Sequence, residues 1–168
     1  MIHKKILSEI SIIYGDVSMP KGFEIDRDKL IKDTITQEIQ DCEFPYSREW
    51  NKLNTFIIEH IICDYEIKLI NKQTWGNSYK PQEVSIPLLN IDTVDLKNSP
   101  DYTCLYGVQV DKCNIRIHYD DNRRKGRSWD IPLKNNKFII FPSTCMYYLT
   151  NKQKNSLNFV QTITYEFD

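Results

Sequence analysis

The second half of the chain constrains the fold most, because it is a series of short segments rich in Val, Ile, Tyr, Phe and Thr. After Pro81 the runs DYTCLYGVQV, NIRIHYD, WDIPL, FIIFPS, MYYLT and LNFVQTITYEF are separated by turn residues over gaps of hairpin length. Such spacing is typical of a β-sandwich or barrel. The gaps have no room for the crossover helices that a parallel sheet needs. The sequence therefore predicts a mainly β, antiparallel fold.

One of these runs, NIRIHYD, alternates cleanly between apolar and polar residues. Successive side chains of a strand point to opposite faces. We therefore expect Ile115, Ile117 and Tyr119 on one face of the strand and Asn114, Arg116 and His118 on the other.

The first half predicts one strand and two helices. Residues 6–18 have strand character, and Asp26 is placed to cap a helix that follows. Ser47 can cap a second helix, whereas residues 68–82 show no clear element. At helical spacing the apolar positions are Leu30, Ile31, Ile35 and Ile39 in the first helix, and Trp50, Leu53, Ile57 and Ile61 in the second. We expect one domain over 1–168, with 1–80 as the N-terminal support and 81–168 as the core.

Composition limits the function classes. The chain has 168 residues, 40% hydrophobic and 27% charged, which is ordinary for a soluble domain. The net charge of −1 argues against non-specific nucleic-acid binding. No apolar run approaches the roughly 20 residues that cross a bilayer, and the start is too charged for a signal peptide. We therefore expect a cytoplasmic protein. The sequence lacks alanine and is rich in Ile, Lys and Asn, which suits an AT-rich phage or marine bacterial genome, with the host cytoplasm as location if phage-encoded.

The five cysteines are scattered and none has Cys-x-x-Cys spacing, so neither a zinc knuckle nor a redox pair is indicated. We expect reduced, mostly buried thiols. Cys145 has no histidine placed to activate it as a nucleophile.

Five segments occur in an order that resembles a known family. They are TWGNSY (74–79), YTCLYGVQV (102–110), IRIHYDD (115–121), KNNKFIIFPS (134–143) and VQTITYEF (160–167). Their order and spacing resemble the double-stranded β-helix of 2-oxoglutarate/Fe(II)-dependent oxygenases, above all a small branch found in phages and marine bacteria. The resemblance implies a cupin-like jelly roll preceded by a strand and two helices.

The same resemblance implies a specific chemistry, for which the expected residues are absent. The iron is held by two histidines and one carboxylate, and a cation, usually an arginine of the last strand, pairs with the co-substrate. The first ligand pair, His-x-His or His-x-Asp, should lie between Trp75 and Gly107, where no histidine occurs and only Asp92, Asp95 and Asp101 could serve. Tyr147 stands at the position of the distal histidine, and Asn158 and Val160 stand where the arginine is expected.

Three hypotheses follow. The first is an oxygenase-like protein with a degenerate iron site and no cofactor, non-catalytic or repurposed to bind a small molecule or a protein. The second is an active dioxygenase, using Fe(II) and 2-oxoglutarate, with an atypical site at His118 and Asp120; the other histidines, His3 and His60, lie near the start and in a predicted helix. The third is a structural or interaction β-sandwich of phage origin. Whether the chain is an enzyme stays open at this point.

Candidate site residues form two sets. Around the former iron position we expect pocket residues that supply flat rings, hydroxyls and amides: Trp75, Asn77, Tyr147, Tyr148, Asn158, Thr162 and Thr164. The charged loop DDNRRKGRSWD and the strand before it could bind an anion through guanidinium groups, or could be a solvated hairpin loop: Arg116, Arg123, Arg124 and Arg127.

Overall fold

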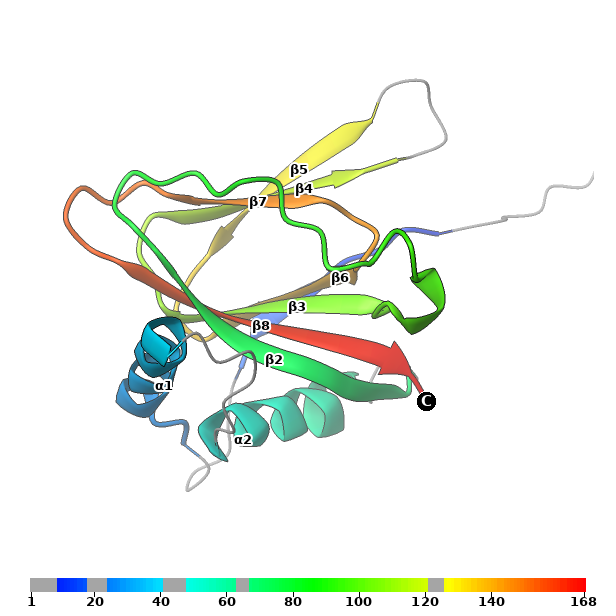
Figure 1. The fold of residues 1–168 in the computed structure, drawn as a ribbon, viewed down its shortest axis with the longest axis horizontal. Coiled ribbons are helices and arrows are strands. Elements are labelled where there is room, and N and C mark those ends of the chain that lie inside the picture. Colours follow the sequence, from blue (N-terminus) through cyan, green and yellow to red (C-terminus); the bar gives the residue numbers. More distant parts are fainter. Residues whose placement is uncertain (1–8, 18–23, 41–47, 63–66, 121–125) are drawn as a thin grey trace, which may run out of the picture.

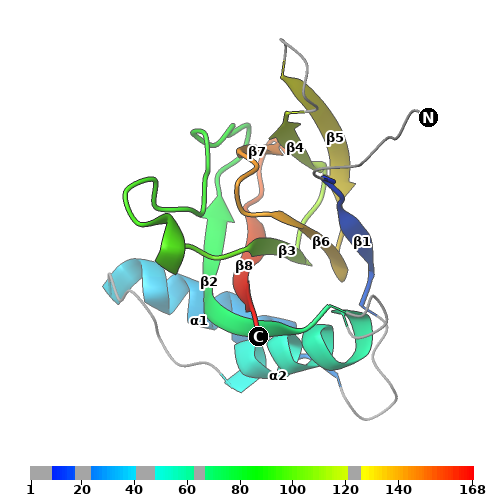
Figure 2. The same ribbon diagram turned by 90° about the vertical axis from the view of Figure 1, so that its right-hand side faces the viewer.

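The computed structural model describes residues 9–17, 24–40, 48–62, 67–120 and 126–168. Two β-sheets stack face to face, and two helices cover the outer face of the larger sheet (Figures 1 and 2). In chain order the elements are β1 (Ile13–Asp16), α1 (Arg27–Gln40), α2 (Arg48–Phe56), the π-helical turn η1 (Ile57–Ile62), β2 (Leu69–Tyr79), the 3₁₀ turn η3 (Leu96–Asn98), β3 (Tyr102–Gln109), β4 (Cys113–Tyr119), β5 (Arg127–Leu133), β6 (Lys137–Pro142), β7 (Tyr147–Asn151) and β8 (Asn158–Phe167).

From β5 to β8 the chain passes back and forth between the two sheets. The larger sheet has the order β1-β6-β3-β8-β2 and the smaller one the order β5-β4-β7, and all pairs are antiparallel. An irregular segment before β3 extends the smaller sheet through the bridges Val84↔Thr150 and Leu88↔Tyr147. The predicted mainly β jelly roll is confirmed at this level.

The space between the sheets is filled by aliphatic and aromatic side chains, among them Leu105, Ile115, Ile117, Phe141 and Leu149. The alternation predicted for β4 is confirmed, because Ile115 and Ile117 are buried while Arg116 is exposed. Burying a side chain of this size contributes roughly 1.5–3 kcal/mol. This inter-sheet core therefore holds the barrel closed around any site that lies inside it.

The first helix starts as predicted but buries a different face. The carboxylate of Asp26 accepts a hydrogen bond from the Lys29 amide at 3.0 Å, which caps α1. Leu30 and Thr34 are buried, whereas Ile35 and Ile39 are 40% and 78% exposed. The predicted apolar stripe therefore holds for Leu30 and for Ile31, which packs against the core, and is wrong for Ile35 and Ile39.

Close contact with β2 explains this rotation of α1. A Cβ atom on Gly76 would lie 2.0 Å from the Thr34 Oγ1, so the helix approaches the strand only because position 76 is glycine. One turn further on, polar side chains face the strand: Gln37 Oε1 accepts from the Gly76 amide at 3.1 Å, and Glu38 accepts from the Ser78 amide at 2.9 Å. Contacts with the strand, not apolar periodicity, set which side of α1 faces the sheet.

The second helix follows its prediction more closely. Trp50, Leu53 and Ile57 are buried on one stripe against the larger sheet. The proposed cap Ser47 lies outside the described residues, and so do the side chains of His60 and Ile61. Among the described residues, no helix is long and apolar enough to cross a membrane.

Two other N-terminal predictions need correction. The strand expected over 6–18 is short, since only Ile13–Asp16 pairs with β6, and residues 1–8 and 18 lie outside the described ranges. Residues 68–82, which showed no clear element, contain β2, the longest described strand. β2 pairs with β8 along its length, so it belongs to the same sheet as strands from the C-terminal half. Of the cysteines, Cys104, Cys113 and Cys145 are buried free thiols as predicted; Cys42 and Cys63 are not described.

Candidate functional site

The site expected from the sequence lies inside the jelly roll, where β7 begins. Tyr147 is the first residue of β7, and its amide and carbonyl exchange hydrogen bonds with Leu88 at 2.9 Å each. Its ring lies between the sheets, with the Phe141 ring edge-on at 5.1 Å. Tyr147 is 2% exposed, so this part of the interior is closed to solvent.

A continuous hydrogen-bond network surrounds the Tyr147 hydroxyl. The Asn90 amide donates to that hydroxyl at 3.3 Å and to the Thr103 Oγ1 at 3.1 Å. The Tyr147 hydroxyl is also hydrogen-bonded with the Thr162 side chain. Thr162 Oγ1 in turn accepts from the Asn77 amide at 3.0 Å. These residues connect β2, β3, β7, β8 and the segment before β3 in a single cluster, called here the Tyr147 network.

The network extends to the end of β6 through Ser143, whose hydroxyl lies 2.8 Å from the Thr103 Oγ1. Thr103, Ser143 and Thr162 are each at most 1% exposed. Burial raises the pKa of Tyr147 to about 12, with the hydrogen bonds from Asn90 and Thr162 acting in the opposite direction. The phenol is therefore neutral at physiological pH, and the cluster is an uncharged, internally satisfied network.

Most of the predicted pocket residues do face the interior. Trp75 and Leu105 both lie directly opposite Thr162 in the sheet, and opposed residues of an antiparallel pair share a face. Asn77 takes part in the network, and Thr164 is buried opposite Thr103.

Two of the predicted pocket residues do not serve the Tyr147 network. Tyr148 points the other way from Tyr147, as adjacent strand residues must, and its ring meets His118 edge-on at 5.3 Å on the outer face of the smaller sheet. Asn158 is fully buried, but its side chain forms hydrogen bonds outside the Tyr147 network. Its side chain exchanges hydrogen bonds with the Asp111 backbone at 3.0 and 3.1 Å and accepts another from Gln153 at 2.9 Å.

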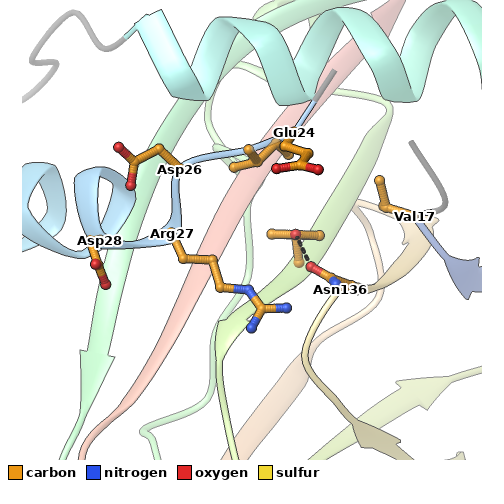
Figure 3. A pocket seen from close by; sticks show the side chains of 8 residues that line it. Val17, Glu24, Asp26, Arg27, Asp28 and Asn136 are labelled. Atoms are coloured by element: carbon orange, nitrogen blue, oxygen red, sulfur yellow. Dashed lines mark hydrogen bonds between the residues drawn. The ribbon is translucent and has the colours of Figure 1, made fainter. Parts of the chain in front are cut away.

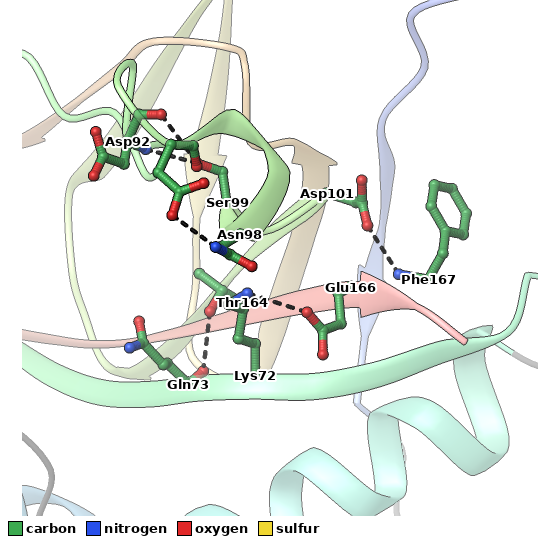
Figure 4. Close-up of polar contacts among 10 residues, drawn as sticks. Lys72, Gln73, Asp92, Asn98, Ser99, Asp101, Thr164, Glu166 and Phe167 are labelled. Carbon is green, nitrogen blue, oxygen red and sulfur yellow. Dashed lines mark hydrogen bonds and ion pairs between the residues drawn. The ribbon is translucent and has the colours of Figure 1, made fainter.

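The three aspartates that could supply a carboxylate ligand all form other hydrogen bonds, and Figure 4 shows Asp92 and Asp101 among them. Asp92 is exposed, and its Oδ1 accepts from the Val94 amide at 2.8 Å in a local turn. Asp95 pairs with the Asn98 side chain at 2.6 Å. Asp101 accepts from the Phe167 amide at 2.9 Å and ties down the end of β8. Over the described ranges, no group of three or more His, Cys, Asp or Glu side chains could hold a metal ion.

The alternative metal pair and the anion candidates lie on the outside. His118 shares a solvent-facing hollow on the smaller sheet with Arg116 and Asp130, away from the Tyr147 network. Arg116 forms a bidentate pair with Asp130 at 2.7 and 2.9 Å, which raises the pKa of the guanidinium. Asp120 is exposed at the end of that strand, and Arg127 is exposed at the start of β5. Arg123 and Arg124 lie outside the described residues.

Comparison with known proteins finds structural neighbours only. No protein-family model matches the chain, and no curated protein matches its sequence. A prolyl-4-hydroxylase from Pseudomonas putida is similar with a TM-score of 0.63 and 9% identity, over 94% of this chain and 88% of that one. A viral collagen prolyl hydroxylase from Paramecium bursaria Chlorella virus-1 is similar with a TM-score of 0.62 and 14% identity, over 94% and 96%. The α-ketoglutarate-dependent epimerase SnoN from nogalamycin biosynthesis has a TM-score of 0.60 at 6% identity, over 93% and 77%.

The chain has the fold of the 2-oxoglutarate/Fe(II) oxygenases. At such low identities the likeness concerns the fold and does not extend to an activity. The sequence resemblance predicts Tyr147 at the position of the distal histidine. Asn90 contacts Tyr147 and is followed two residues later by Asp92, so Asn90-Ile91-Asp92 has His-x-Asp spacing with asparagine in place of histidine.

The residues present do not fit the iron centre of this fold. A non-haem Fe(II) site of this kind uses two imidazoles and one carboxylate. The side chains around Tyr147 are instead an amide and a phenol bonded to each other, and the nearby carboxylate of Asp92 accepts from the Val94 amide. On β8, where a cation would pair with the co-substrate, Val160 is apolar and the side chain of Asn158 is occupied by the Asp111 backbone. The basic side chain beside the far end of β8 is Lys72, which pairs with Glu166 at 3.1 Å.

Sequence reasoning missed Asn90, Thr103 and Ser143. The spacing of Asn90 from Asp92 was a usable signal, but it appears only once the histidine is allowed to be another residue. Thr103 and Ser143 carried no signal, because a lone hydroxyl in a strand or turn is common.

Proposed function

We propose that this protein has the oxygenase fold without oxygenase chemistry. In this proposal it neither holds Fe(II) at the Tyr147 network nor consumes 2-oxoglutarate, and it acts by binding a small molecule or another protein. The observation that carries the proposal is the hydrogen bond between Asn90 and Tyr147 at the place where imidazole ligands would be needed. A buried network whose members satisfy one another gains nothing from admitting a metal ion.

The missing co-substrate clamp supports the proposal independently. Co-substrate binding in this fold relies on a charge-assisted pair between a cation and a carboxylate. The β8 positions considered for that cation hold an apolar and a fully hydrogen-bonded neutral side chain. A dicarboxylate placed in this interior would bury charge without a partner, which costs several kcal/mol.

The proposal includes an intracellular site of action. The buried free thiols at Cys104, Cys113 and Cys145 are consistent with a reducing compartment.

Metal titration and turnover test the proposal together. The purified chain is titrated with Co(II), Mn(II) and Fe(II) by calorimetry, and succinate release from 2-oxoglutarate is followed with Fe(II) and oxygen. The P. putida prolyl-4-hydroxylase serves as the positive control for both assays. We expect no specific metal uptake and no succinate above the rate without protein. Micromolar uptake of one ion per chain together with succinate formation would show that the protein is a working oxygenase.

One variant separates the alternative site from the main proposal. If metal uptake is seen, replacing His118→Ala tests whether His118 and Asp120 provide it. Loss of uptake would favour the atypical oxygenase. Unchanged uptake would place the metal elsewhere and would reject both readings.

A further inference from the structure

A second hollow lies outside the jelly-roll interior, between the start of α1, the end of β1 and the turn that leads into β6 (Figure 3). Its volume is about 490 Å³, which is ample for a small organic molecule. The side chains used below are Glu24 and Arg27 on its walls and Tyr106 and Asn136 on its floor. None of these residues belongs to the Tyr147 network.

The floor of the hollow is rigid. Tyr106 is 1% exposed, and its hydroxyl donates to the Asn136 Oδ1 at 2.7 Å. Asn136 has a φ of 62°, in the left-handed region that asparagine tolerates better than most residues. Its backbone N–H donates to the Gly107 carbonyl at 2.9 Å. A fixed phenol and a fixed amide are suitable groups for orienting a ligand.

Arg27 supplies a positive charge with which no described residue forms an ion pair. Its side chain is half-buried and extends toward Asn136 (Figure 3). Over the described residues its guanidinium makes no hydrogen bond or ion pair, although its charge acts on Tyr106. A half-buried guanidinium keeps five donors that a carboxylate can engage in a bidentate pair.

The acidic residues around the hollow select among possible anions. Asp26 is occupied by capping α1, and Asp28 points away from Arg27 in Figure 3. In that view the Glu24 carboxylate lies above Asn136, whereas the Arg27 guanidinium lies beside and below it. A simple anion attracted by Arg27 would therefore meet repulsion from Glu24, whereas a ligand with one group of each sign would be complementary to both.

We propose that this hollow binds a small zwitterion of the α-amino-acid type. Its carboxylate pairs with Arg27, its ammonium group faces Glu24, and the remaining atoms lie against Val17 and Asn136, which line the hollow. This site goes beyond the proposed function and does not depend on it, because it involves neither the former iron position nor the jelly-roll interior.

The test uses the full chain with the common L-amino acids, each at millimolar concentration, by saturation-transfer NMR and calorimetry. Acetate and methylamine are the single-charge controls. We expect at least one amino acid to bind saturably and both controls to bind at least about tenfold more weakly, since each lacks one charge-assisted contact. Arg27→Gln and Glu24→Gln should each reduce affinity by about tenfold or more.

Matched variants make the outcome decisive. Lys32→Gln removes an exposed positive charge from the same helix and Asp28→Asn removes a negative one, and both should leave affinity unchanged. Circular dichroism establishes that each variant is folded. Absence of binding by any amino acid to the folded native chain would overturn the proposal, as would binding that survives Arg27→Gln. Acetate binding as tightly as the amino acids would also overturn it, because the site would then be a plain anion site. Metal uptake or turnover elsewhere in the chain would bear only on the proposed function.

Discussion

Removing the Tyr147 hydroxyl is the most informative single perturbation of the interior. Tyr147→Phe keeps the ring and its contact with Phe141, but it removes the hydrogen bonds with Asn90 and Thr162. Thr162 is 1% exposed, so it has no access to replacement water. A net hydrogen bond contributes about 1 kcal/mol, and a buried group left unpaired costs about 1–3 kcal/mol. We expect the free energy of unfolding to fall by about 2 kcal/mol.

Urea denaturation followed by circular dichroism measures this change. Tyr148→Phe is the matched control, since it deletes the same atom one residue later on the outer face, and it should change stability by less than about 0.5 kcal/mol. A double-mutant cycle that combines Tyr147→Phe with Thr162→Val then isolates the contact between these two side chains. Their coupling energy should be about 0.5–3 kcal/mol. If Tyr147→Phe is no more destabilising than Tyr148→Phe, the network does not stabilise the interior and the reasoning about its role is wrong.

Three further predictions concern a glycine of β3, the metal position and alkaline pH. Gly107→Ala should lower the free energy of unfolding by about 1–3 kcal/mol, because its Cβ would lie 2.2 Å from the Lys134 carbonyl oxygen. Gly126→Ala is the control and should be near neutral, since the nearest neighbour of its Cβ lies at 3.9 Å. Thermal melts compare the two variants, and equal effects would contradict the prediction. The double variant Asn90→His, Tyr147→His should bind Co(II) and show a visible absorption band that the native chain lacks. If the double variant is folded and binds no Co(II), these two residues do not mark the metal position. Because burial raises the pKa of Tyr147 from 10.0 to about 12, the phenol ionises at lower pH in the unfolded chain than in the folded one. The free energy of unfolding should therefore stay constant below pH 10 and fall between pH 10 and pH 12 by about 1.4 kcal/mol per pH unit for this group. Denaturant titrations measure this, and a constant free energy of unfolding over that range would argue against the burial of Tyr147.

Local sequence patterns predicted the elements whose structure depends on residues close to them in the chain. The alternation around Ile115 and Ile117 identified the inner face of β4, and the capping carboxylate of Asp26 located the start of α1. Both signals depend on neighbours within a few residues, which is why they are readable from a sequence.

Features that depend on distant partners could not be predicted in this way. Ile35 and Ile39 fit a helical stripe, yet the close approach of Thr34 to Gly76 turned them toward solvent. β2 was hidden because its residues face either a helix or a polar interior, so its pattern lacks simple alternation. Asn90 and Thr103 are 13 residues apart and become site residues only because β3 and the preceding segment meet at Tyr147.

The side chains of Gln37 and Glu38 occupy backbone amides of Gly76 and Ser78 on β2, the outermost strand of the larger sheet. An outermost strand with vacant amides is a template on which further chains can pair. α1 therefore shields this margin of the sheet from intermolecular strand addition. A fragment that lacks α1 but keeps β2 would expose these amides, so its loss of solubility would reflect an uncovered margin as much as a weaker core.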